Sequence, residues 1–364
     1  MSEEPASPKP LFQPIFKGDG KLNPQAISKL PPPPTWRRTA RRKQERGVTF
    51  QAQPSEIELV NAAMYLRRPL LVTGKPGTGK TSLAYAIARE LDLGEVLYWP
   101  ITTRTTLKDG LYLYDAIARL QDVGDQERGN FDNIGKYIRL GPLGTALIES
   151  DKPRILIVDE IDKSDIDLPN DLLYVFEEGQ FEIPELVRIE ETKSSVEVLT
   201  AYRDKSEFTF NDGKKIQNGK TIIEGGQVTC SQFPLMILTS NGERDFPPPF
   251  LRRCVRLTME EPNAQRLEAI VKAHMKQQSQ EDGEDGADLV ARSETLIKAL
   301  IQKFLKKRSD SSKGDLATDQ LLNAMYLMTR ERHPDIDSRE DLIDRLWKHL
   351  SSSEDQQSDS SRKR

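Results

Sequence analysis

The sequence predicts an α/β fold in which a parallel sheet, flanked by helices, carries a phosphate-binding loop and is followed by a small all-α domain. Three features of the chain predict it. The apolar run 70–72 leads into a glycine-rich loop and then into a helical stretch. A second apolar run, 155–158, ends in carboxylates, and a third, 235–238, ends in small polar residues. Continuous apolar runs of this length are typical of parallel strands buried on both faces.

The glycine-rich loop has the pattern of a P-loop between a strand and a helix. Its glycines let backbone N–H groups turn toward phosphate oxygens, and the helix N-terminus adds partial positive charge. Lys80 can reach the β- and γ-phosphates, and the Thr81 hydroxyl can ligate Mg²⁺. The loop therefore predicts binding of a nucleoside triphosphate with Mg²⁺, through Gly74, Lys75, Pro76, Gly77, Thr78, Gly79, Lys80, Thr81 and Ser82.

Asp159 and Glu160 follow the second apolar run directly. Acidic residues at the carboxyl end of such a strand lie beside the crevice where doubly wound sheets bind ligands. Taken alone, the pattern fits a solvated acidic turn equally well. Together with the glycine loop, it predicts that Asp159 and Thr81 hold Mg²⁺, the former through water. It also predicts that Glu160 orients or deprotonates the attacking water.

A polar residue, Asn241, follows the third apolar run and could hydrogen-bond the attacking water or the γ-phosphate. A proline run and the pair Arg252-Arg253 come shortly afterwards. An isolated arginine pair is usually solvated surface. Because this pair closely follows a strand end, we interpret it as a source of an arginine finger.

The order and wording of these motifs resemble the AAA+ ATPases, and the stretch 239–254 resembles the MoxR-like branch in particular. The resemblance covers roughly residues 50 to 350. In the terms of that family, Walker A, Walker B, sensor 1 and the arginine finger correspond to residues 74–81, 159–160, 239–241 and 250–254.

The resemblance implies ATP hydrolysis at a site shared between the subunits of a hexameric ring, and it implies that the ring moves a client protein. Arg253, or Arg252, of an adjacent subunit then offsets charge on the γ-phosphoryl group. Two other classes stay open. One is a nucleic-acid-stimulated motor or restriction-type GTPase. The other is a nucleotide-gated switch of a signalling or defence system, with little turnover.

Two inserts interrupt the predicted core at 51–261. Lys80 and Asp159 lie 79 positions apart, which is more than one helix and one strand need, and the extra residues fall in 102–148. Asp159 and Asn241 lie 82 apart, with the excess in 182–228. In that second insert, Asp212-Gly213 between alternating stretches predicts a hairpin. MoxR-like proteins carry comparable inserts, and both are candidate surfaces for a client.

A helical lid is predicted over 262–350, with a flexible acidic loop near 277–286 and a disordered tail at 351–364. Family members offer a sensor 2 arginine near a helix start. Here Thr318 suits an N-cap, and Gln320 stands where the arginine is expected. Nearby Arg330 or Arg332 could substitute for it, and without a substitute hydrolysis is expected to be slow.

The segment 1–50 holds ten Lys or Arg against four Asp or Glu and is rich in proline, although the whole chain has a net charge of −4. It cannot bury a core and favours an extended arm. Its basic cluster beside Trp36 is compatible with nucleic-acid binding. We favour a tether that packs on a neighbouring subunit or partner.

Composition predicts a reducing, cytoplasmic setting. Its two cysteines, Cys230 and Cys254, cannot form a disulfide framework. Its three histidines lack metal-ligand spacing, and we expect them at the surface: His274, His333 and His349. No apolar run approaches the roughly 18 residues of a membrane span, and the acidic start does not fit a signal peptide.

Overall fold

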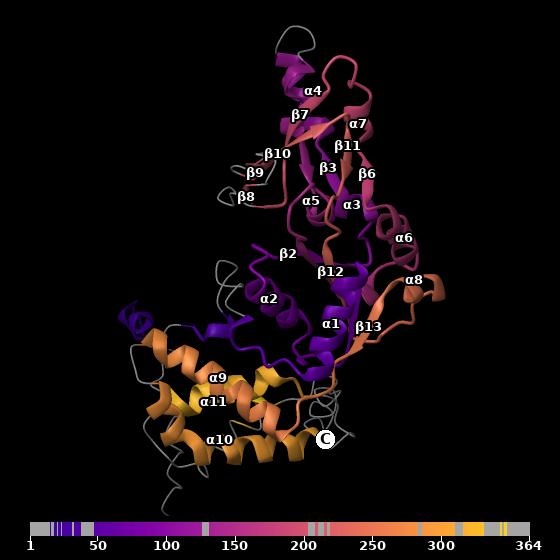
Figure 1. Cartoon of the computed structure of the whole chain (residues 1–364). Coiled ribbons are helices and arrows are strands. Elements are labelled where there is room, and N and C mark those ends of the chain that lie inside the picture. Colours follow the sequence, from indigo (N-terminus) through magenta and orange to yellow (C-terminus); the bar gives the residue numbers. More distant parts are fainter. Residues whose placement is uncertain are drawn as a thin grey trace, which may run out of the picture. The chain divides into compact units, whose positions relative to one another are not determined.

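The computed structural model describes residues 47–125, 131–202, 219–282, 286–309 and 316–330, with short pieces at 15, 18–19, 21–22, 24–30, 33–37, 208–209, 215–216, 343 and 346–347. The chain divides into two compact units (Figure 1). We call them the core unit, formed by Gln44–Lys75 and Gly79–Glu260, and the helical unit, formed by Met1–Lys43, Pro76–Thr78 and Glu261–Arg364. Arg332, His333, His349, the Asp212-Gly213 turn and the tail lie outside the described residues.

A five-stranded sheet forms the centre of the core unit, in the order β13-β1-β12-β5-β2. Every neighbouring pair in it is parallel. The predicted parallel sheet is therefore confirmed, and its strands are β1 (Leu70–Thr73), β2 (Leu97–Pro100), β5 (Ile155–Asp159), β12 (Leu235–Ser240) and β13 (Val255–Thr258).

Alternate residues of the central strands enter two separate cores. Ile155 and Ile157 of β5 pack in the cluster that includes α1 (Pro54–Leu66) and α2 (Lys80–Glu90). Leu156 of β5 belongs to the opposite cluster. Since both faces are covered, these strands are apolar at every position before their polar carboxyl ends, as buried parallel strands require.

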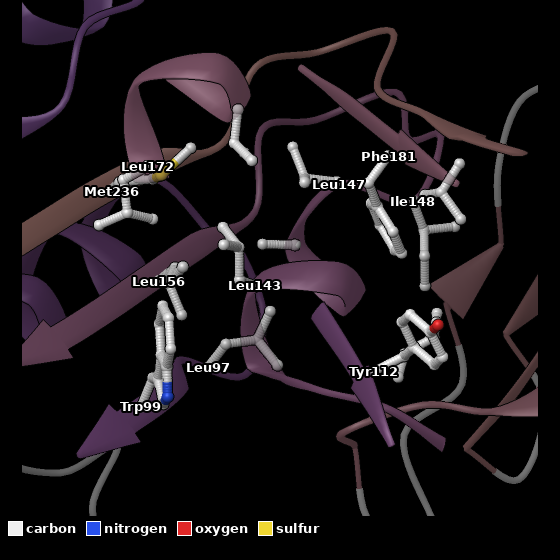
Figure 2. Packing of buried hydrophobic residues seen from close by; sticks show 14 of the residues in the cluster. Leu97, Trp99, Tyr112, Leu143, Leu147, Ile148, Leu156, Leu172, Phe181 and Met236 are labelled. Atoms are coloured by element: carbon white, nitrogen blue, oxygen red, sulfur yellow. The ribbon is translucent and has the colours of Figure 1, made fainter. Parts of the chain in front are cut away.

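The second cluster also contains side chains of α5 (Pro142–Ala146), α6 (Leu168–Glu178) and α8 (Pro248–Arg253). Figure 2 shows Leu97 and Trp99 of β2 and Leu156 of β5 around Leu143 of α5, with Phe181 and Tyr112 farther along the same cluster. The core of the central sheet therefore continues without a break into the inserts.

The two predicted inserts meet in a single six-stranded sheet, in the order β3-β4-β7-β10-β11-β6. β4 of the first insert pairs in parallel with β7 of the second, through Arg139 and Leu199. The spacing of motifs predicted the inserts but not this pairing. The strands are β3 (Tyr112–Tyr114), β4 (Ile138–Leu140), β6 (Gln180–Glu182), β7 (Ser195–Leu199), β10 (Lys220–Glu224) and β11 (Gln227–Thr229).

The predicted hairpin is confirmed by β8 (Phe208–Thr209), which pairs antiparallel with β9 (Lys215–Ile216). Short helices complete the inserts and the turn after β5: α3 (Leu107–Leu111), α4 (Ala116–Asp125), η4 (Phe131–Tyr137), η5 (Ile161–Lys163) and α7 (Pro184–Val187).

The helical unit is built on α9 (Ala264–Asp282), α10 (Gly286–Arg308) and α11 (Thr318–Arg330). Phe304 and Trp347 meet edge to face in its core. α9 extends through Asp282, so residues 277–282 are helical and the expectation of a loop there was wrong. None of the helices in the described part of the chain is long and apolar enough to cross a membrane.

The helical unit also includes two short 3₁₀ helices from the start of the chain, η1 (Pro24–Lys29) and η2 (Thr35–Arg37). Trp36 of η2 packs on α11 within this unit: its Nε1 donates to Asn323 Oδ1 at 2.9 Å. Its ring lies edge to face with His274 and Tyr326, at centroid distances of 5.5 and 5.9 Å. This part of the predicted arm is thus an internal contact rather than a tether to another molecule.

His274 is not the surface residue that we expected. It lines a small cavity of about 30 Å³ beneath Trp36, and burial lowers its pKa to about 4. Its Nδ1 atom is buried without a hydrogen-bond partner among the described residues.

Candidate functional site

The loop after β1 has the backbone geometry that its glycines predict. Gly77 and Gly79 have φ angles of +79° and +96°, which side-chain-bearing residues rarely adopt. Gly79 is the N-cap of α2, and the helix begins at Lys80. The helix N-terminus therefore follows the loop directly, where its free N–H groups favour an anion. Thr81 and Ser82, both half-buried, lie in its first turn.

The Lys80 side chain is held at the centre of the site and is 8% exposed. Its ammonium donates to the carbonyl oxygens of Gly74 and Lys75, at 2.6 and 3.0 Å, and to Asn241 Oδ1 at 2.8 Å. Burial lowers the Lys80 pKa, and the carboxylates of Asp162, Asp159 and Glu160 oppose that shift. Two residues predicted to act on the nucleotide, Lys80 and Asn241, are therefore in direct contact.

The Asp159 carboxylate lies beside them, at the carboxyl end of β5. Its Oδ1 accepts from the hydroxyls of Thr239 at 2.7 Å and Thr81 at 3.3 Å. Its Oδ2 accepts from the Tyr98 hydroxyl at 2.6 Å. Burial and this hydrogen bond raise the Tyr98 pKa, so the phenol stays a donor at neutral pH.

The predicted Mg²⁺ ligands thus lie together. A hydroxyl and a carboxylate oxygen, the donors that Mg²⁺ accepts in phosphate-binding sites, come from Thr81 and Asp159. Within the described residues, no cluster of three or more His, Cys, Asp or Glu side chains could hold a metal ion. The arrangement fits a Mg²⁺ ion that takes most of its ligands from water and phosphate.

Glu160 adopts a left-handed backbone conformation, with φ of 60° and ψ of 49°. Such a conformation costs on the order of 1–3 kcal/mol for a residue other than glycine and is common at functional sites. Its N–H donates to Thr239 Oγ1 at 2.9 Å. Its carboxylate accepts from the Lys163 ammonium at 2.7 Å.

Asp162 joins the turn after β5 to the turn after β12. Its Oδ2 accepts from the backbone N–H groups of Asn241 and Glu243, at 2.9 and 3.1 Å. Asp162 is 3% exposed, and its Oδ1 has no hydrogen-bond partner among the described residues. The position of Asn241 therefore depends on a carboxylate that the motif did not include.

The two arginines on α8 differ. The Arg253 guanidinium donates to the Glu177 carboxylate, through Nε at 2.6 Å and through Nη2, and to the Pro249 carbonyl oxygen at 3.2 Å. Arg252 is exposed, and its side chain has no partner in the part of the chain that the structure describes. Neither arginine is brought to Lys80 or Asp159 within one chain, and their role as fingers stays a prediction.

Gln320 has a structural role at the start of α11. Its Oε1 accepts from the Ala317 N–H at 3.1 Å, which satisfies a free N–H at the helix start, as in a capping box. The helix begins at Thr318, so its N-cap is Ala317 and not Thr318, the residue that the sequence predicted.

Sequence reasoning missed four residues of the site. Thr239 lies inside the motif at 239–241, and Asp162 and Lys163 follow the motif at 159–160 closely, so their polar side chains near strand ends were a usable signal. Tyr98 gave no such signal in the sequence, because its contact with Asp159 depends on how β2 pairs with β5.

One comparison, with models of protein families, agrees with this architecture. Residues 69–217 match the family model described as AAA domain (dynein-related subfamily). The search of curated proteins gave no match.

Among solved structures, the chain is similar to NtrX from Brucella abortus, crystallised in complex with ADP, with a TM-score of 0.34 and 15% identity. That match covers 83% of this chain and 61% of the NtrX chain, so this chain spans less than two thirds of its length. Residues 69–217 are therefore similar to an AAA domain, and the core unit has an α/β fold with a parallel sheet flanked by helices, as in the P-loop NTPases of that kind.

Proposed function

We propose that the protein is a Mg²⁺-dependent ATPase of the MoxR-like branch, active as a ring whose subunits share their active sites and remodel a client protein. One observation carries the hydrolytic part. Three side chains from the ends of three different strands converge at one edge of the sheet: Lys80 after β1, Asp159 at the end of β5 and Asn241 after β12. Lys80 contacts Asn241, and the hydroxyls of Thr81 and Thr239 donate to Asp159.

The chain's own residues divide the work of hydrolysis. The N–H groups of the loop and of the first turn of α2 bind the phosphates, and Lys80 moves from Asn241 to the β- and γ-phosphates. Thr81 and Asp159 would hold Mg²⁺, which when bound neutralises charge on the β- and γ-phosphate oxygens. Asn241, once released by Lys80, orients the attacking water, and Glu160 accepts its proton.

An arginine from a second copy completes the proposed site. Arg252 is the better candidate, because it is exposed and Arg253 is engaged by Glu177 within its own chain. A trans-acting arginine is typically worth 10³–10⁵ in rate, so an isolated subunit should be nearly inactive. The number of subunits, six in the resembling family, and the client are part of the proposal.

The second candidate is a nucleotide-gated switch that binds ATP and turns it over slowly. Gln320, which caps α11 in place of an expected sensor arginine, favours it. The nucleic-acid motor has no comparable support, since its one supporting feature included Trp36, which packs inside the helical unit.

Two variants test the hydrolytic part. Lys80→Ala should abolish ATP binding, because it removes the cation at the centre of the site. Glu160→Gln should bind ATP with Mg²⁺ as the wild type does and lose turnover, because an amide cannot accept the proton. Binding is measured with a fluorescent ATP analogue and turnover as released phosphate. Normal hydrolysis by Glu160→Gln would contradict the role of Glu160, and slow wild-type turnover despite tight binding would favour the switch.

A further inference from the structure

The neighbouring strands β5 and β12 continue past the point where their pairing ends. Their parallel register stops with Leu238 opposite Val158. β5 itself continues to Asp159, and β12 continues to Ser240. The backbone groups that follow the last pair lie at the edge of the sheet that carries the site, and they need hydrogen-bond partners other than the ladder.

The hydroxyl of Thr239, on β12, is a partner of this kind for the turn after β5. Its Oγ1 accepts from the Glu160 N–H at 2.9 Å and donates to Asp159 Oδ1 at 2.7 Å. A hydroxyl has one hydrogen and two lone pairs, so both bonds form at once. Thr239 is 1% exposed, so bulk water does not compete for these bonds. One hydroxyl on β12 therefore holds both acidic residues at the end of β5.

Asp162 makes the same kind of connection in the opposite direction. From the turn after β5, its Oδ2 accepts from the N–H groups of Asn241 and Glu243, which follow β12. Between them, the Gly242 N–H is bound by Ser240 Oγ at 3.0 Å. Three successive N–H groups of the turn after β12 are therefore bound by side chains, two of them by a buried carboxylate of the neighbouring turn.

The backbone of Glu160 shows what the first connection does. Its φ of 60° lies in the left-handed region, which a residue other than glycine keeps only where the surrounding structure holds it. The bond to Thr239 fixes the N–H of this residue from the neighbouring strand. Because φ and ψ set the direction of the side chain, the same bond sets where the carboxylate points.

We propose that Thr239 and Asp162 are positioning residues that form a reciprocal clamp across the ends of β5 and β12. Thr239 holds Glu160, the proposed base, and Asp162 holds Asn241, the residue proposed to orient the attacking water. The clamp fixes these two groups, which come from different strands, relative to each other. The proposal rests on the proposed ATPase function, and no covalent step is involved.

Thr239→Val tests the first half of the clamp, because valine keeps the shape of the side chain and removes the hydroxyl. With ATP and Mg²⁺ saturating, we expect kcat to fall about 10- to 100-fold, as is usual when a supporting hydrogen bond or a small displacement affects a catalytic group. Affinity for a fluorescent ATP analogue should not change, since the phosphate-binding loop is intact. Thr239→Ser should keep the wild-type kcat, because serine restores the hydroxyl.

The Mg²⁺ dependence separates the hold on Glu160 from the hold on Asp159. Thr239→Val and Tyr98→Phe each remove one hydroxyl donor from the Asp159 carboxylate. Excess Mg²⁺ should restore kcat in Tyr98→Phe, whose loss is confined to the metal ligand. It should not restore kcat in Thr239→Val, which also loses the bond to the Glu160 N–H.

Thr145→Val is the matched control for folding. Thr145 is also fully buried, and its hydroxyl accepts from the Ala201 N–H at 2.9 Å, in the inserts and away from the site. We expect both valine variants to lower Tm, because each leaves a backbone N–H without its partner. Only Thr239→Val should lower kcat.

Asp162→Leu and Asp162→Asn test the second half of the clamp. Leucine removes the acceptor of both N–H groups, whereas asparagine keeps one oxygen for them. We expect kcat to fall about 10- to 100-fold in Asp162→Leu and less in Asp162→Asn, since the amide is a weaker acceptor than the carboxylate. Both variants are assayed below the Tm of the less stable one, so that unfolding does not contribute.

The outcomes separate the clamp from the ATPase itself. A wild-type kcat in Thr239→Val or in Asp162→Leu overturns the corresponding half of the clamp and leaves the ATPase standing. Equal losses in Thr239→Val and Thr239→Ser, or a recovery of Thr239→Val in excess Mg²⁺, also overturn the hold on Glu160. If the wild type binds the fluorescent ATP analogue and does not hydrolyse ATP, both proposals are contradicted.

Discussion

Asp159 shows how the site is organised at the scale of single residues. Three hydroxyl groups, from Thr81, Thr239 and Tyr98, donate to its two oxygens. Hydrogen bonds to a carboxylate are among the stronger ones, and together these fix the direction of its oxygens. We infer that Tyr98, on the neighbouring strand β2, orients Asp159 for Mg²⁺.

Tyr98→Phe removes one hydroxyl and keeps the ring. Loss of a hydrogen bond that orients a metal ligand usually costs 10- to 100-fold in metal affinity, so the Mg²⁺ concentration for half-maximal binding of a fluorescent ATP analogue should rise about tenfold. Affinity for the analogue without metal should not change.

Tyr112→Phe is the matched control, because it removes a similar bond, to Glu185 at 2.9 Å, in the insert sheet. An unchanged Mg²⁺ titration in Tyr98→Phe would mean that Thr81 and Thr239 orient Asp159 without help.

At the scale of elements, η2 and α9 meet at a buried histidine. Because burial lowers the pKa of His274 from 6.5 to about 4, the unfolded chain takes up a proton at a higher pH than the folded chain does. The contribution of His274 to the free energy of unfolding is therefore most favourable above pH 6.5, and it becomes less favourable as pH falls from there toward 4. The difference is up to about 3 kcal/mol in the free energy of unfolding of the helical unit.

His274→Phe should remove this pH dependence, since phenylalanine fills the space beside Trp36 and cannot be protonated. Urea unfolding of the full chain at pH 7 and pH 5, followed by tryptophan fluorescence, measures the difference. An equal loss of stability at pH 5 in the wild type and the variant would show that other groups set the acid sensitivity.

The elements that carry the site could be predicted, because each is local in sequence: β1 with its glycine loop, and the polar ends of β5 and β12. Parallel strands then bring those ends to one edge of the sheet. The pairing of β4 with β7 joins Arg139 to Leu199, 60 positions away, and no local pattern encodes it. Tyr98 reaches Asp159 only because of the register in which β2 pairs with β5, and Lys163 reaches Glu160 only because of the η5 turn. Both contacts depend on the folded geometry.

At the scale of the whole molecule, the proposed active site requires more than one copy of the chain. Glu160, Lys80, Asn241 and Asp159 are gathered within one core unit, whereas Arg252 has no role there. The predicted division of the chain into core, lid, arm and tail stays a prediction, as does the assignment of the insert sheet to client binding.

The measurement that tests this account most directly is ATP hydrolysis per subunit across a hundredfold range of protein concentration, for the wild type, Arg252→Ala and Arg253→Ala. We predict that the wild-type rate per subunit climbs with concentration. We also predict that Arg252→Ala loses 10³-fold or more while it still binds ATP, and that Arg253→Ala loses less. A wild-type rate that is independent of concentration, with full activity in Arg252→Ala, would show that one chain holds the complete site and would contradict the shared-site ATPase.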